Sequence, residues 1–395
     1  MSKKHILFIV ENNSVPFDPR VWNEARAARE FGYEVTVICP SDARKKDSRS
    51  LIDGIRILRH PQVPEGSGKA LLILEYLNAT FWELLLSLRV FATHPFNVIH
   101  GANPPDHVFL VAAPFKLFGV KYLFDHHDIV PENYIAKFGK KGVLYRLLLL
   151  MERLTFKSSD LVISTNESYK KIAMGRGGKR SEEIFVVRNG PDIERMPEAV
   201  SDPKLREGFR YIVGYVGVLG QQEGIDNLLQ AVDHIVREKK RIDIKFIIVG
   251  SGPHLKSLIK KSRDLGLETF VQFTGYVPDR VLHAVLASSD VCVNPEFGNE
   301  FTDKSTMIKI MEYMMFAKPI VQFHTTEGEV SAGESAVYIR ENSVPRFAAA
   351  ILDLLDNPEQ RAKMGAWGRK RIEERLGWAR QKQQLADAYR TILKS

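Results

Sequence analysis

The sequence predicts an α/β protein with two domains, each built on a doubly wound parallel sheet. Short apolar runs alternate with amphipathic helical patterns along the whole chain, which is typical of βαβ units. The chain has 395 residues, which is more than one ordinary hydrophobic core contains. A polar stretch interrupts the alternation near the middle. We therefore expect domains at 1–190 and 210–376, a linker at 191–209 and a final helical segment at 377–395.

The strands are predicted where apolar and β-branched residues form short runs bounded by turn residues. The first half contains seven such runs: His5–Val10, Glu34–Cys39, Ile55–Arg59, Val98–His100, Lys121–Asp125, Leu161–Ser164 and Ile184–Val187. The second half contains six: Tyr211–Val216, Lys245–Val249, Val271–Thr274, Asp290–Val293, Ile320–Phe323 and Ala336–Ile339. Helical periodicity predicts a helix after the first strand, at Trp22–Phe31, and a helical C-terminal end at Val344–Asp356, Pro358–Leu376 and Trp378–Leu393.

Composition narrows the class of protein. A hydrophobic content of 44% and a charged content of 26% are typical of a soluble globular protein. The most apolar stretch, Ala70–Phe91, is interrupted by Glu75, Glu83 and Arg89, so we expect no transmembrane helix. The first residues lead directly into a strand, which predicts no signal peptide. Two cysteines far apart in sequence favour a reducing compartment, and we expect a cytoplasmic protein.

Positive charge is concentrated in the first half of the chain. Residues 1–190 hold 27 Lys and Arg against 20 Asp and Glu, a net charge of +7, whereas the remainder is nearly neutral. Such a balance suits an acidic partner, namely anionic lipid headgroups, a diphosphate-linked acceptor or nucleic acid. Surface lysines that serve only solubility explain it equally well.

The segment Asn294–Gln322 carries the most specific pattern. A strand leads into a polar loop, and a helix is expected to begin near Ser305 and Thr306, with Glu312 about two turns inside. The N-terminal end of a helix favours anions such as phosphate. Lys304 and Lys309 add positive charge beside it, and Glu312 lies at a reach suited to a ribose diol. The segment therefore predicts a site for a nucleotide diphosphate.

This segment resembles the donor-site motif of retaining family 4 glycosyltransferases, in which two Glu residues eight positions apart precede an apolar strand. Glu312 matches the second Glu, and Glu-Tyr-Met-Met-Phe-Ala-Lys-Pro-Ile-Val follows the rest of the motif. Lys304 stands where the first Glu is expected. Relatives also carry an Arg and a Lys after the first strand of this domain, where this chain has Val218 and Glu223. We infer that Lys304, Lys309 and backbone N–H groups near Gly217 and Ser305 replace that phosphate clamp, and we assign catalytic roles to both lysines.

Two further glycine-containing loops match the resemblance. Gly250-Ser251-Gly252 ends a strand, and Gly275-Tyr276-Val277-Pro278 ends the next. Alone, each is an ordinary tight turn. In this order, the resemblance implies that Gly250 and Gly252 line the donor site and that the backbone of Tyr276 and Val277 holds the base.

The first domain is expected to carry the acceptor side. His127 and Asp128 follow a strand end, where ligands bind in open α/β sheets, within Asp125-His126-His127-Asp128. The resemblance implies that His127 lies near the reacting carbon of the donor sugar. Arg20, Asp18 and Asn103 are the other acceptor-side candidates, although Asp18 is equally well explained as a helix N-cap. His126 has the simpler explanation of a histidine bonded at a strand end.

The resemblance covers nearly the whole chain and implies a GT-B fold, in which two Rossmann-like domains face a central cleft and the last helix crosses back to the first domain. It also implies transfer of a sugar from a nucleotide diphosphate sugar, most simply a UDP-sugar, with retention of anomeric configuration. No cofactor, metal or nucleic acid is expected, and the sequence shows no D-x-D motif.

Two apolar stretches suggest the acceptor. Leu71–Phe91 and Val143–Phe156 are rich in Leu and Phe, and basic residues border the second: Lys137, Lys140, Lys141, Arg146, Arg153 and Lys157. This combination suits an anionic membrane surface and a lipid-diphosphate-linked or saccharide acceptor in cell-surface polysaccharide synthesis, including exopolysaccharide and lipopolysaccharide. We therefore expect peripheral attachment at the inner face of the cell membrane. Core packing of the leucines remains an alternative.

Two other functions also remain open. One is a nucleotide-sugar 2-epimerase on the same fold. The other is a non-catalytic partner in a polysaccharide-synthesis complex, which the departures at Lys304, Val218 and Glu223 keep in consideration.

Overall fold

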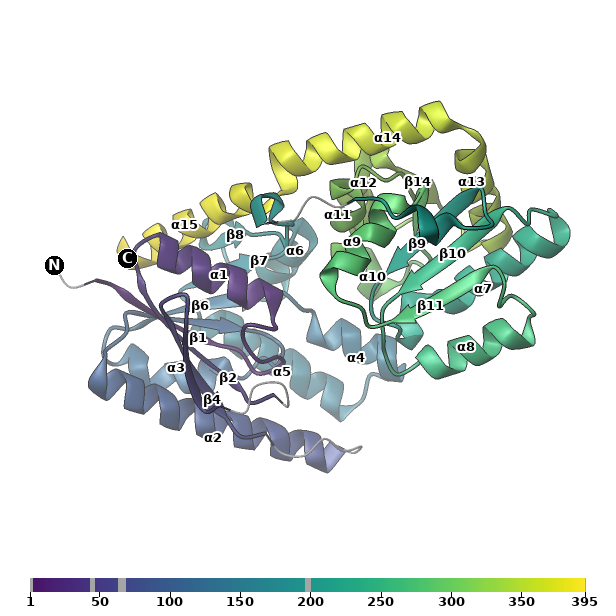
Figure 1. Ribbon diagram of the computed structural model, residues 1–395. Helices are drawn as coiled ribbons and strands as arrows, with labels where there is room; N and C mark the ends of the chain where they lie inside the picture. The colour runs from purple at the N-terminus through teal and green to yellow at the C-terminus, as the bar shows by residue number, and fades with distance from the viewer. Residues whose placement is uncertain (1–2, 43–46, 63–68, 196–199, 395) are drawn as a thin grey trace. The chain divides into compact units, whose positions relative to one another are not determined.

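The computed structural model describes residues 3–42, 47–62, 69–195 and 200–394, and the chain divides into two compact units (Figure 1). Unit 1 comprises Met1–Asn189 and Gln381–Ser395, and unit 2 comprises Gly190–Arg380. Residues 191–209, which the sequence analysis treats as a linker, are counted in unit 2. The two parallel-sheet α/β units agree with the predicted fold class.

Unit 1 contains an eight-stranded sheet in the order β3-β4-β2-β1-β5-β6-β7-β8, parallel except for the edge strand β3, which runs antiparallel to β4. Its strands are β1 (His5–Ile9), β2 (Glu34–Pro40), β3 (Arg49–Ile52), β4 (Ile55–His60), β5 (Val98–Ala102), β6 (Lys121–His126), β7 (Leu161–Ser164) and β8 (Ile184–Val186). The strand order reverses between β1 and β5, which is where ligands bind in open α/β sheets.

Helices cover both faces of this sheet (Figure 1). They are α1 (Pro19–Glu30), α2 (Lys69–Thr93), α3 (Val108–Lys116), α4 (Val130–Phe138), α5 (Val143–Ser158), α6 (Glu167–Gly175) and α15 (Trp378–Lys394). One core cluster joins the sheet to α2, α3, α5 and α6 through Val90, Phe115, Phe156 and Ala173, while α1 and α15 lie on the other face. From Gln381 onward, α15 belongs to unit 1.

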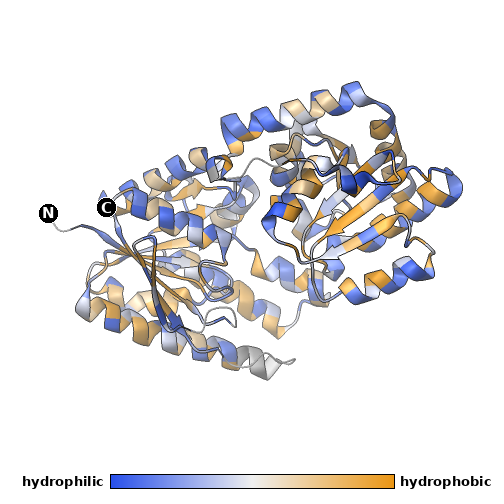
Figure 2. Ribbon diagram, viewed as in Figure 1, coloured by the Kyte–Doolittle hydropathy of each residue, from blue (hydrophilic) through white to orange (hydrophobic). Residues whose placement is uncertain are grey.

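Unit 2 contains a six-stranded, fully parallel sheet in the order β11-β10-β9-β12-β13-β14. Its strands are β9 (Tyr211–Val216), β10 (Ile244–Val249), β11 (Val271–Gly275), β12 (Val291–Asn294), β13 (Ile320–Phe323) and β14 (Ala336–Ile339). The order reverses between β9 and β12. Figure 2 shows the strands in hydrophobic colours between helices that are polar on their outer side, as expected for sheets buried on both faces.

Two core clusters, one on each face, hold the helices of unit 2 against the sheet. The helices are α7 (Ile225–Asp233), α8 (Leu255–Asp264), α9 (Asp279–Ser288), α10 (Glu300–Lys304), α11 (Ile308–Met315), α12 (Thr326–Ala332), α13 (Val344–Asp356) and α14 (Pro358–Arg371). A π-helical turn, Ile372–Leu376, follows α14. Leu228 and Phe347 belong to one cluster, and Ile310 and Met314 to the other.

The structure changes two details that matter for the site. The predicted helix begins at Ile308 rather than near Ser305. Part of the predicted polar loop forms a separate short helix, α10, which Asn299 caps and which is followed by a turn at Ser305. Lys304 therefore ends α10, and Glu312 lies little more than one turn inside α11. The edge strand β3 was not predicted from the sequence.

Candidate functional site

The chemistry-bearing residues of unit 1 gather at the carboxyl ends of β1, β5 and β6. Arg20, on the first turn of α1, is 7% exposed, and its guanidinium donates to both carboxylate oxygens of Asp125, at 2.6 and 2.8 Å. Its Nη2 also lies 3.1 Å from Glu24, one turn later on α1. The Arg20 side chain is thus used inside unit 1, where it fixes the end of β6.

His127 is oriented by that carboxylate. Its Nδ1 lies 3.0 Å from Asp125 Oδ2, so Nδ1 carries the proton and Nε2 keeps a lone pair in the neutral ring. Burial favours the neutral ring, but the charge of Asp125 outweighs it and raises the pKa of His127. Burial would raise the pKa of Asp125, but Arg20 and His127 hold it well below its usual range. The pair can accept a proton from a hydroxyl group.

Asn103 and Asp18 shape the loops of this edge. The Asn103 Oδ1 accepts the backbone N–H of His127 at 2.9 Å and of Asp128 at 3.0 Å, and Asn103 is 1% exposed. Asp18 caps α1 by accepting from Val21 N–H. Of the acceptor-side candidates, only Asp128 is half-buried rather than buried, and burial raises its pKa. Asn103 therefore fixes the backbone at His127 and Asp128, Arg20 fixes the carboxylate beside His127, and Asp18 fixes the start of α1.

Sequence reasoning placed His100 near this edge of the sheet but did not connect it to Glu24 and Tyr389. His100, in β5, places Nδ1 2.7 Å from the hydroxyl of Tyr389 on α15, and its Nε2 3.2 Å from Glu24. The spacing of four residues between Arg20 and Glu24 was the available signal, because such residues share a helix face. The last helix is thereby connected to the carboxylates that hold Arg20. His126 is fully buried among Phe124, Phe156 and Tyr169, and burial lowers its pKa to about 3.

In unit 2, the ammonium group of Lys309 lies at the point where the strand order reverses between β9 and β12. Lys309 Nζ is 2.7 Å from Glu223 Oε2, after β9, and 3.8 Å from Glu296 Oε2, after β12. It also donates to the Tyr215 hydroxyl at 3.2 Å and to Asn294 Oδ1 at 3.4 Å. Burial favours the neutral amine, but the carboxylates hold the pKa of Lys309 well above its ordinary value.

Two glycines allow these loops to approach. A Cβ on Gly224, beside Glu223, would lie 2.1 Å from the carbonyl oxygen of Pro295, beside Glu296. A Cβ on Gly250 would lie 1.8 Å from the carbonyl oxygen of Gly217. Only glycine fits at such contacts. Gly250 therefore brings the loop after β10 against the loop after β9, and Gly252 packs in the same way against Leu219.

The expected backbone donors are already engaged. The N–H of Gly217 donates to Val249 O at 3.1 Å, and the N–H of Ser305 to Thr302 O at 3.3 Å. The hydroxyl of Ser305 donates to Phe301 O. These two N–H groups are therefore used within unit 2, and a role for other backbone N–H groups near Gly217 and Ser305 stays a prediction. The other groups that could bind the diphosphate here are Lys309 and the first turn of α11, which Thr306 precedes.

The other predicted donor residues lie around α11. Glu312 is half-buried, three residues after Lys309, and burial raises its pKa. Lys304 Nζ lies 3.2 Å from Glu300 within α10. Tyr276 is 82% exposed and Val277 is partly buried, both after β11.

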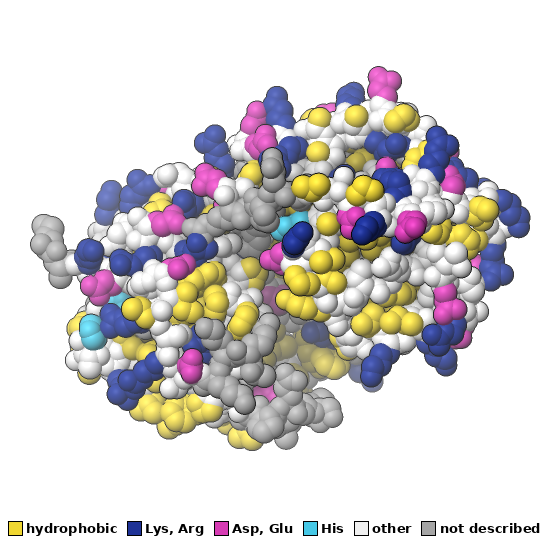
Figure 3. Space-filling view, viewed as in Figure 1, with side chains coloured by type: hydrophobic (Ala, Val, Ile, Leu, Met, Phe, Trp, Pro, Cys, Tyr) yellow, Lys and Arg dark blue, Asp and Glu magenta, His cyan; other side chains and the backbone are white. Residues whose placement is uncertain are grey.

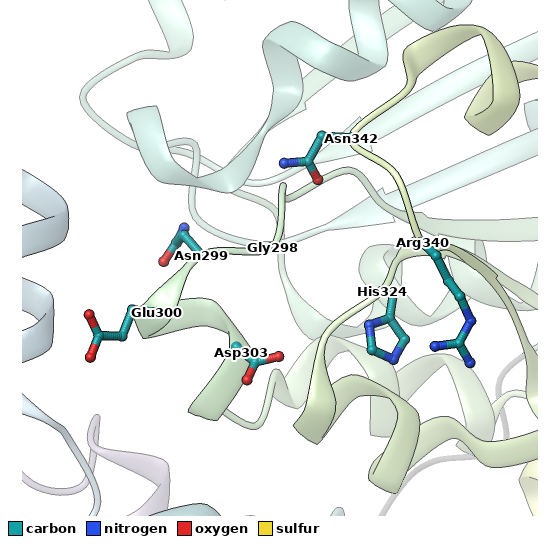
Figure 4. Close-up of a pocket in the computed structure, with 7 residues that line it drawn as sticks. All are labelled: Gly298, Asn299, Glu300, Asp303, His324, Arg340 and Asn342. Atoms are coloured by element: carbon teal, nitrogen blue, oxygen red, sulfur yellow. The ribbon is translucent and has the colours of Figure 1, made fainter.

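An open cavity of about 440 Å³ lies at the carboxyl ends of β12, β13 and β14 (Figure 4). It is lined by Gly298, Asn299, Glu300, Asp303, His324, Arg340 and Asn342. None of the residues predicted for the donor site lines it. Asp303 accepts from the backbone N–H and hydroxyl of Thr326, and Glu329 pairs with both His324 and Arg340. These polar groups thus support the loops of unit 2.

Comparisons with known proteins match both units to one family. A family model described as "Glycosyl transferase 4-like domain" matches residues 18–190, and one described as "Glycosyl transferases group 1" matches residues 210–357. The chain is 28% identical over 239 residues to a GDP-mannose-dependent alpha-(1-6)-phosphatidylinositol monomannoside mannosyltransferase of Mycobacterium tuberculosis, covering 58% of this chain and 61% of that one. It spans about half to three-fifths of the length of the first curated relatives it matches.

Solved structures share the fold along nearly the whole chain. Sucrose-phosphate synthase of Thermosynechococcus elongatus superimposes with a TM-score of 0.80 at 16% identity, covering 99% of this chain and 100% of that one. The Anabaena protein HepE in complex with UDP-glucose gives a TM-score of 0.75 at 18% identity, covering 98% and 99%. With two family models matched in order and this fold, the chain belongs to the group 1 (family 4) glycosyltransferases of GT-B fold.

Proposed function

We propose that this protein transfers a hexosyl group from a nucleotide diphosphate sugar, most simply a UDP-sugar, to a lipid-linked or saccharide acceptor in cell-surface polysaccharide synthesis. The observation that carries the proposal is the ammonium group of Lys309, held where the strand order of unit 2 reverses and three residues before Glu312. This is the position at which open α/β sheets bind ligands. A cation there suits a diphosphate, and Glu312 suits the ribose.

The charge around Lys309 suits a leaving group. Glu223 neutralises the ammonium group when no ligand is bound, and the Glu223 side chain is 24% exposed. A diphosphate would compete with Glu223 for Lys309. Because negative charge builds on the diphosphate as the sugar leaves, Lys309 stabilises the transition state more than the ground state. Lys304, at the end of α10, adds a second positive charge.

We infer transfer with retention and without a metal at the diphosphate. Lys304 stands where the family motif has its first Glu, so no carboxylate nucleophile is available at that position. The remaining route is attack by the acceptor on the face that the diphosphate leaves, assisted by a phosphate oxygen. In unit 1, His127 offers Nε2 to a sugar or acceptor hydroxyl, with Asp125 holding its other nitrogen.

A UDP-sugar and a lipid-linked acceptor are supported by the relatives. HepE was solved in complex with UDP-glucose, whereas the mycobacterial relative is GDP-mannose-dependent and acts on a phosphatidylinositol monomannoside. A lipid-linked acceptor provides an apolar tail and a negative charge, which matches the basic character of residues 1–190.

The surface of unit 1 supports attachment to an anionic membrane. Along α2, five large apolar side chains recur every three or four residues and are each about half exposed: Leu74, Leu77, Phe81, Leu85 and Leu88. On α5, Val143, Leu147, Leu150 and Leu154 repeat the pattern. Figure 3 shows hydrophobic side chains gathered over α2 along the lower edge of this unit. Exposed apolar stripes of this size mark interaction surfaces. If these leucines packed in the core, their side chains would instead be buried.

The basic side chains named for this surface lie beside α5. Lys137, Lys140, Lys141, Arg146, Arg153 and Lys157 are all exposed. In the described part of the chain, no helix combines the length and the hydrophobicity that crossing a bilayer requires. We therefore propose that α2 and α5 lie in the headgroup region with their apolar stripes inserted.

An assay for free nucleoside diphosphate tests the enzymatic proposal. The purified chain would be incubated with a panel of nucleotide sugars, with and without lipid extract as acceptor, and the sugar product analysed. A glycosyltransferase releases diphosphate in proportion to acceptor. A 2-epimerase converts the sugar in the absence of acceptor, and a non-catalytic partner does neither. Either of the last two outcomes would replace the proposal.

A further inference from the structure

A second cluster of potential ligand groups lies at the carboxyl edge of the unit 1 sheet. Glu11 follows β1, His60 ends β4 and Glu83 projects from the middle of α2. One ligand atom from each of these side chains lies within 4.8 Å of those of the other two. The proposed transfer reaction uses none of them.

The hydrogen bonds around the cluster prepare His60 as a ligand. Its Nδ1 lies 3.2 Å from the carbonyl oxygen of Pro61, which can only accept, so Nδ1 carries the hydrogen. The lone pair of Nε2 then points toward the Glu11 side chain, with Oε2 3.0 Å away. A histidine bonded to a backbone carbonyl through its other nitrogen is the usual arrangement of a metal ligand.

Glu83 is held in the same manner. The Glu83 Oε2 is 2.7 Å from His107 Nε2, and the side chain of Glu83 is fully buried. His107 in turn stacks on Tyr76, with ring centroids 6.3 Å apart and planes at 11°. These contacts fix the carboxylate through Oε2 and leave Oε1 without a hydrogen-bond partner.

Three buried atoms of the cluster lack a hydrogen-bond partner: Glu11 Oε2, His60 Nε2 and Glu83 Oε1. A single proton between Glu11 and His60 would satisfy two of them and leave Glu83 Oε1 without a donor. Leaving a buried carboxylate oxygen unpaired is costly. A cation bound by all three atoms would satisfy the whole set.

The neighbouring acidic cluster shows the contrast. Glu24, His100 and Asp125 also bring ligand atoms within 4.8 Å of one another, but Arg20 lies against both of its carboxylates and supplies the positive charge. Within the described residues, no Lys or Arg forms an ion pair with Glu11 or Glu83. The acids of the first cluster pair instead with imidazoles, Glu11 with His60 and Glu83 with His107, so this cluster contains no fixed positive charge.

We propose that Glu11, His60 and Glu83 bind one divalent first-row metal ion such as Zn²⁺ or Mn²⁺. One imidazole nitrogen and two carboxylate oxygens suit these ions. Ligand atoms around a tetrahedral Zn²⁺ lie about 3.4 Å apart, so small side-chain movements complete the site. The Glu11 side chain is 15% exposed, so the cluster lies close to the surface although its ligand atoms are buried. The ion would connect β1, β4 and α2 beside the strand reversal of unit 1.

Calorimetric titration of the full chain, stripped of metal with a chelator and dialysed, tests this proposal. With ZnCl₂ and separately with MnCl₂, we expect one ion bound per chain. Glu83→Gln and His60→Gln should each weaken binding by about tenfold or more. Glu11→Gln, on the partly exposed side chain, gives a third variant in case a buried substitution prevents folding, which circular dichroism would reveal. The Mn²⁺ electron paramagnetic resonance signal gives a second measure of the bound fraction.

His324→Gln is the matched control, because it removes a histidine that is paired with a glutamate at 2.7 Å, in unit 2. This variant should bind metal as the wild type does. Absence of binding at roughly 100 µM Zn²⁺ and Mn²⁺ would overturn the proposal. Unchanged affinity in the folded cluster variants would do the same, because it would place the ion elsewhere. Neither outcome bears on glycosyl transfer, which the diphosphate assay tests separately.

Discussion

Lys309 Nζ lies 2.7 Å from Glu223 Oε2, so the cation of the proposed donor site and the residue that replaces the expected lysine form an ion pair. The resemblance places a lysine at position 223 to grip the diphosphate. Here the loop after β9 carries a carboxylate, and the ammonium group comes from α11. The positive charge is thus retained at the strand reversal but is supplied by a different element, with a built-in counter-ion that a diphosphate would displace.

Lys309→Ala should lower kcat by about 10²–10³-fold and raise the donor KM much less. The diphosphate gains charge toward the transition state, so the missing ammonium group costs most there. Steady-state kinetics with the donor identified by the diphosphate assay measures both constants. Lys260→Ala, which removes an exposed lysine near the end of α8, is the control and should behave as the wild type. If KM instead rose by about 10²–10³-fold and kcat stayed unchanged, Lys309 would contribute to ground-state binding only.

Glu223→Gln should strengthen binding of nucleoside diphosphate by about tenfold or less. The amide keeps a hydrogen-bond acceptor for Lys309 and removes the competing negative charge, an effect worth about 1 kcal/mol at a partly exposed pair. Calorimetric titration with UDP and other nucleoside diphosphates measures it. Weaker binding in the variant would mean that Glu223 holds Lys309 in its active position rather than competing with the ligand.

Stability should depend on pH through Glu296. This carboxyl is 3% exposed, and burial raises its pKa to about 7 despite the opposing charge of Lys309. Its unfolded pKa is about 4.3, so the folded state binds more protons between these values, and this group makes stability fall as pH rises from about 4.3 to 7. The full loss, about 3–4 kcal/mol for this difference in pKa, is present above pH 7.

Denaturant unfolding of the wild type and of Glu296→Gln at about pH 5 and about pH 8 measures this loss. The variant lacks the titrating group, so its advantage over the wild type should grow between the two pH values. Parallel pH profiles for the two proteins would show that Lys309 keeps Glu296 ionised in the folded state throughout this range.

Glu312→Gln should weaken donor binding by about 1–3 kcal/mol, the range for losing a charged hydrogen bond to a hydroxyl pair. Gln has nearly the same shape as Glu, so the substitution keeps the packing of this half-buried side chain and removes only its charge. Titration with a nucleoside diphosphate and with its 2′-deoxy analogue measures the effect. The difference between the two ligands should shrink in the variant, and an unchanged difference would remove Glu312 from the ribose.

The sequence predicted most strands to within one or two residues, because apolar runs between turn residues define buried parallel strands. It missed β3, whose residues Arg49–Ile52 are largely exposed at an edge and lack a buried run. It also assigned α10 to a polar loop, because five residues are too few to show helical periodicity. The motif predicted Lys309 and Glu312 as site residues. The Glu223–Lys309 contact joins residues 86 apart in sequence, and no rule of sequence spacing predicts a contact over that separation.

Membrane attachment should be peripheral and depend on both charge and apolar side chains. Replacing Lys137, Lys140 and Lys141 by Gln should release the protein from anionic vesicles, since each basic residue near the surface contributes about 1 kcal/mol. Because Leu77 is 64% and Phe81 60% exposed, the double substitution Leu77→Ser and Phe81→Ser should reduce binding without lowering Tm. Vesicle sedimentation at low and high salt separates the two effects, because only the lysine contribution is screened. If the double variant unfolds at a lower temperature and still sediments with vesicles, these side chains pack within the protein and the membrane proposal fails.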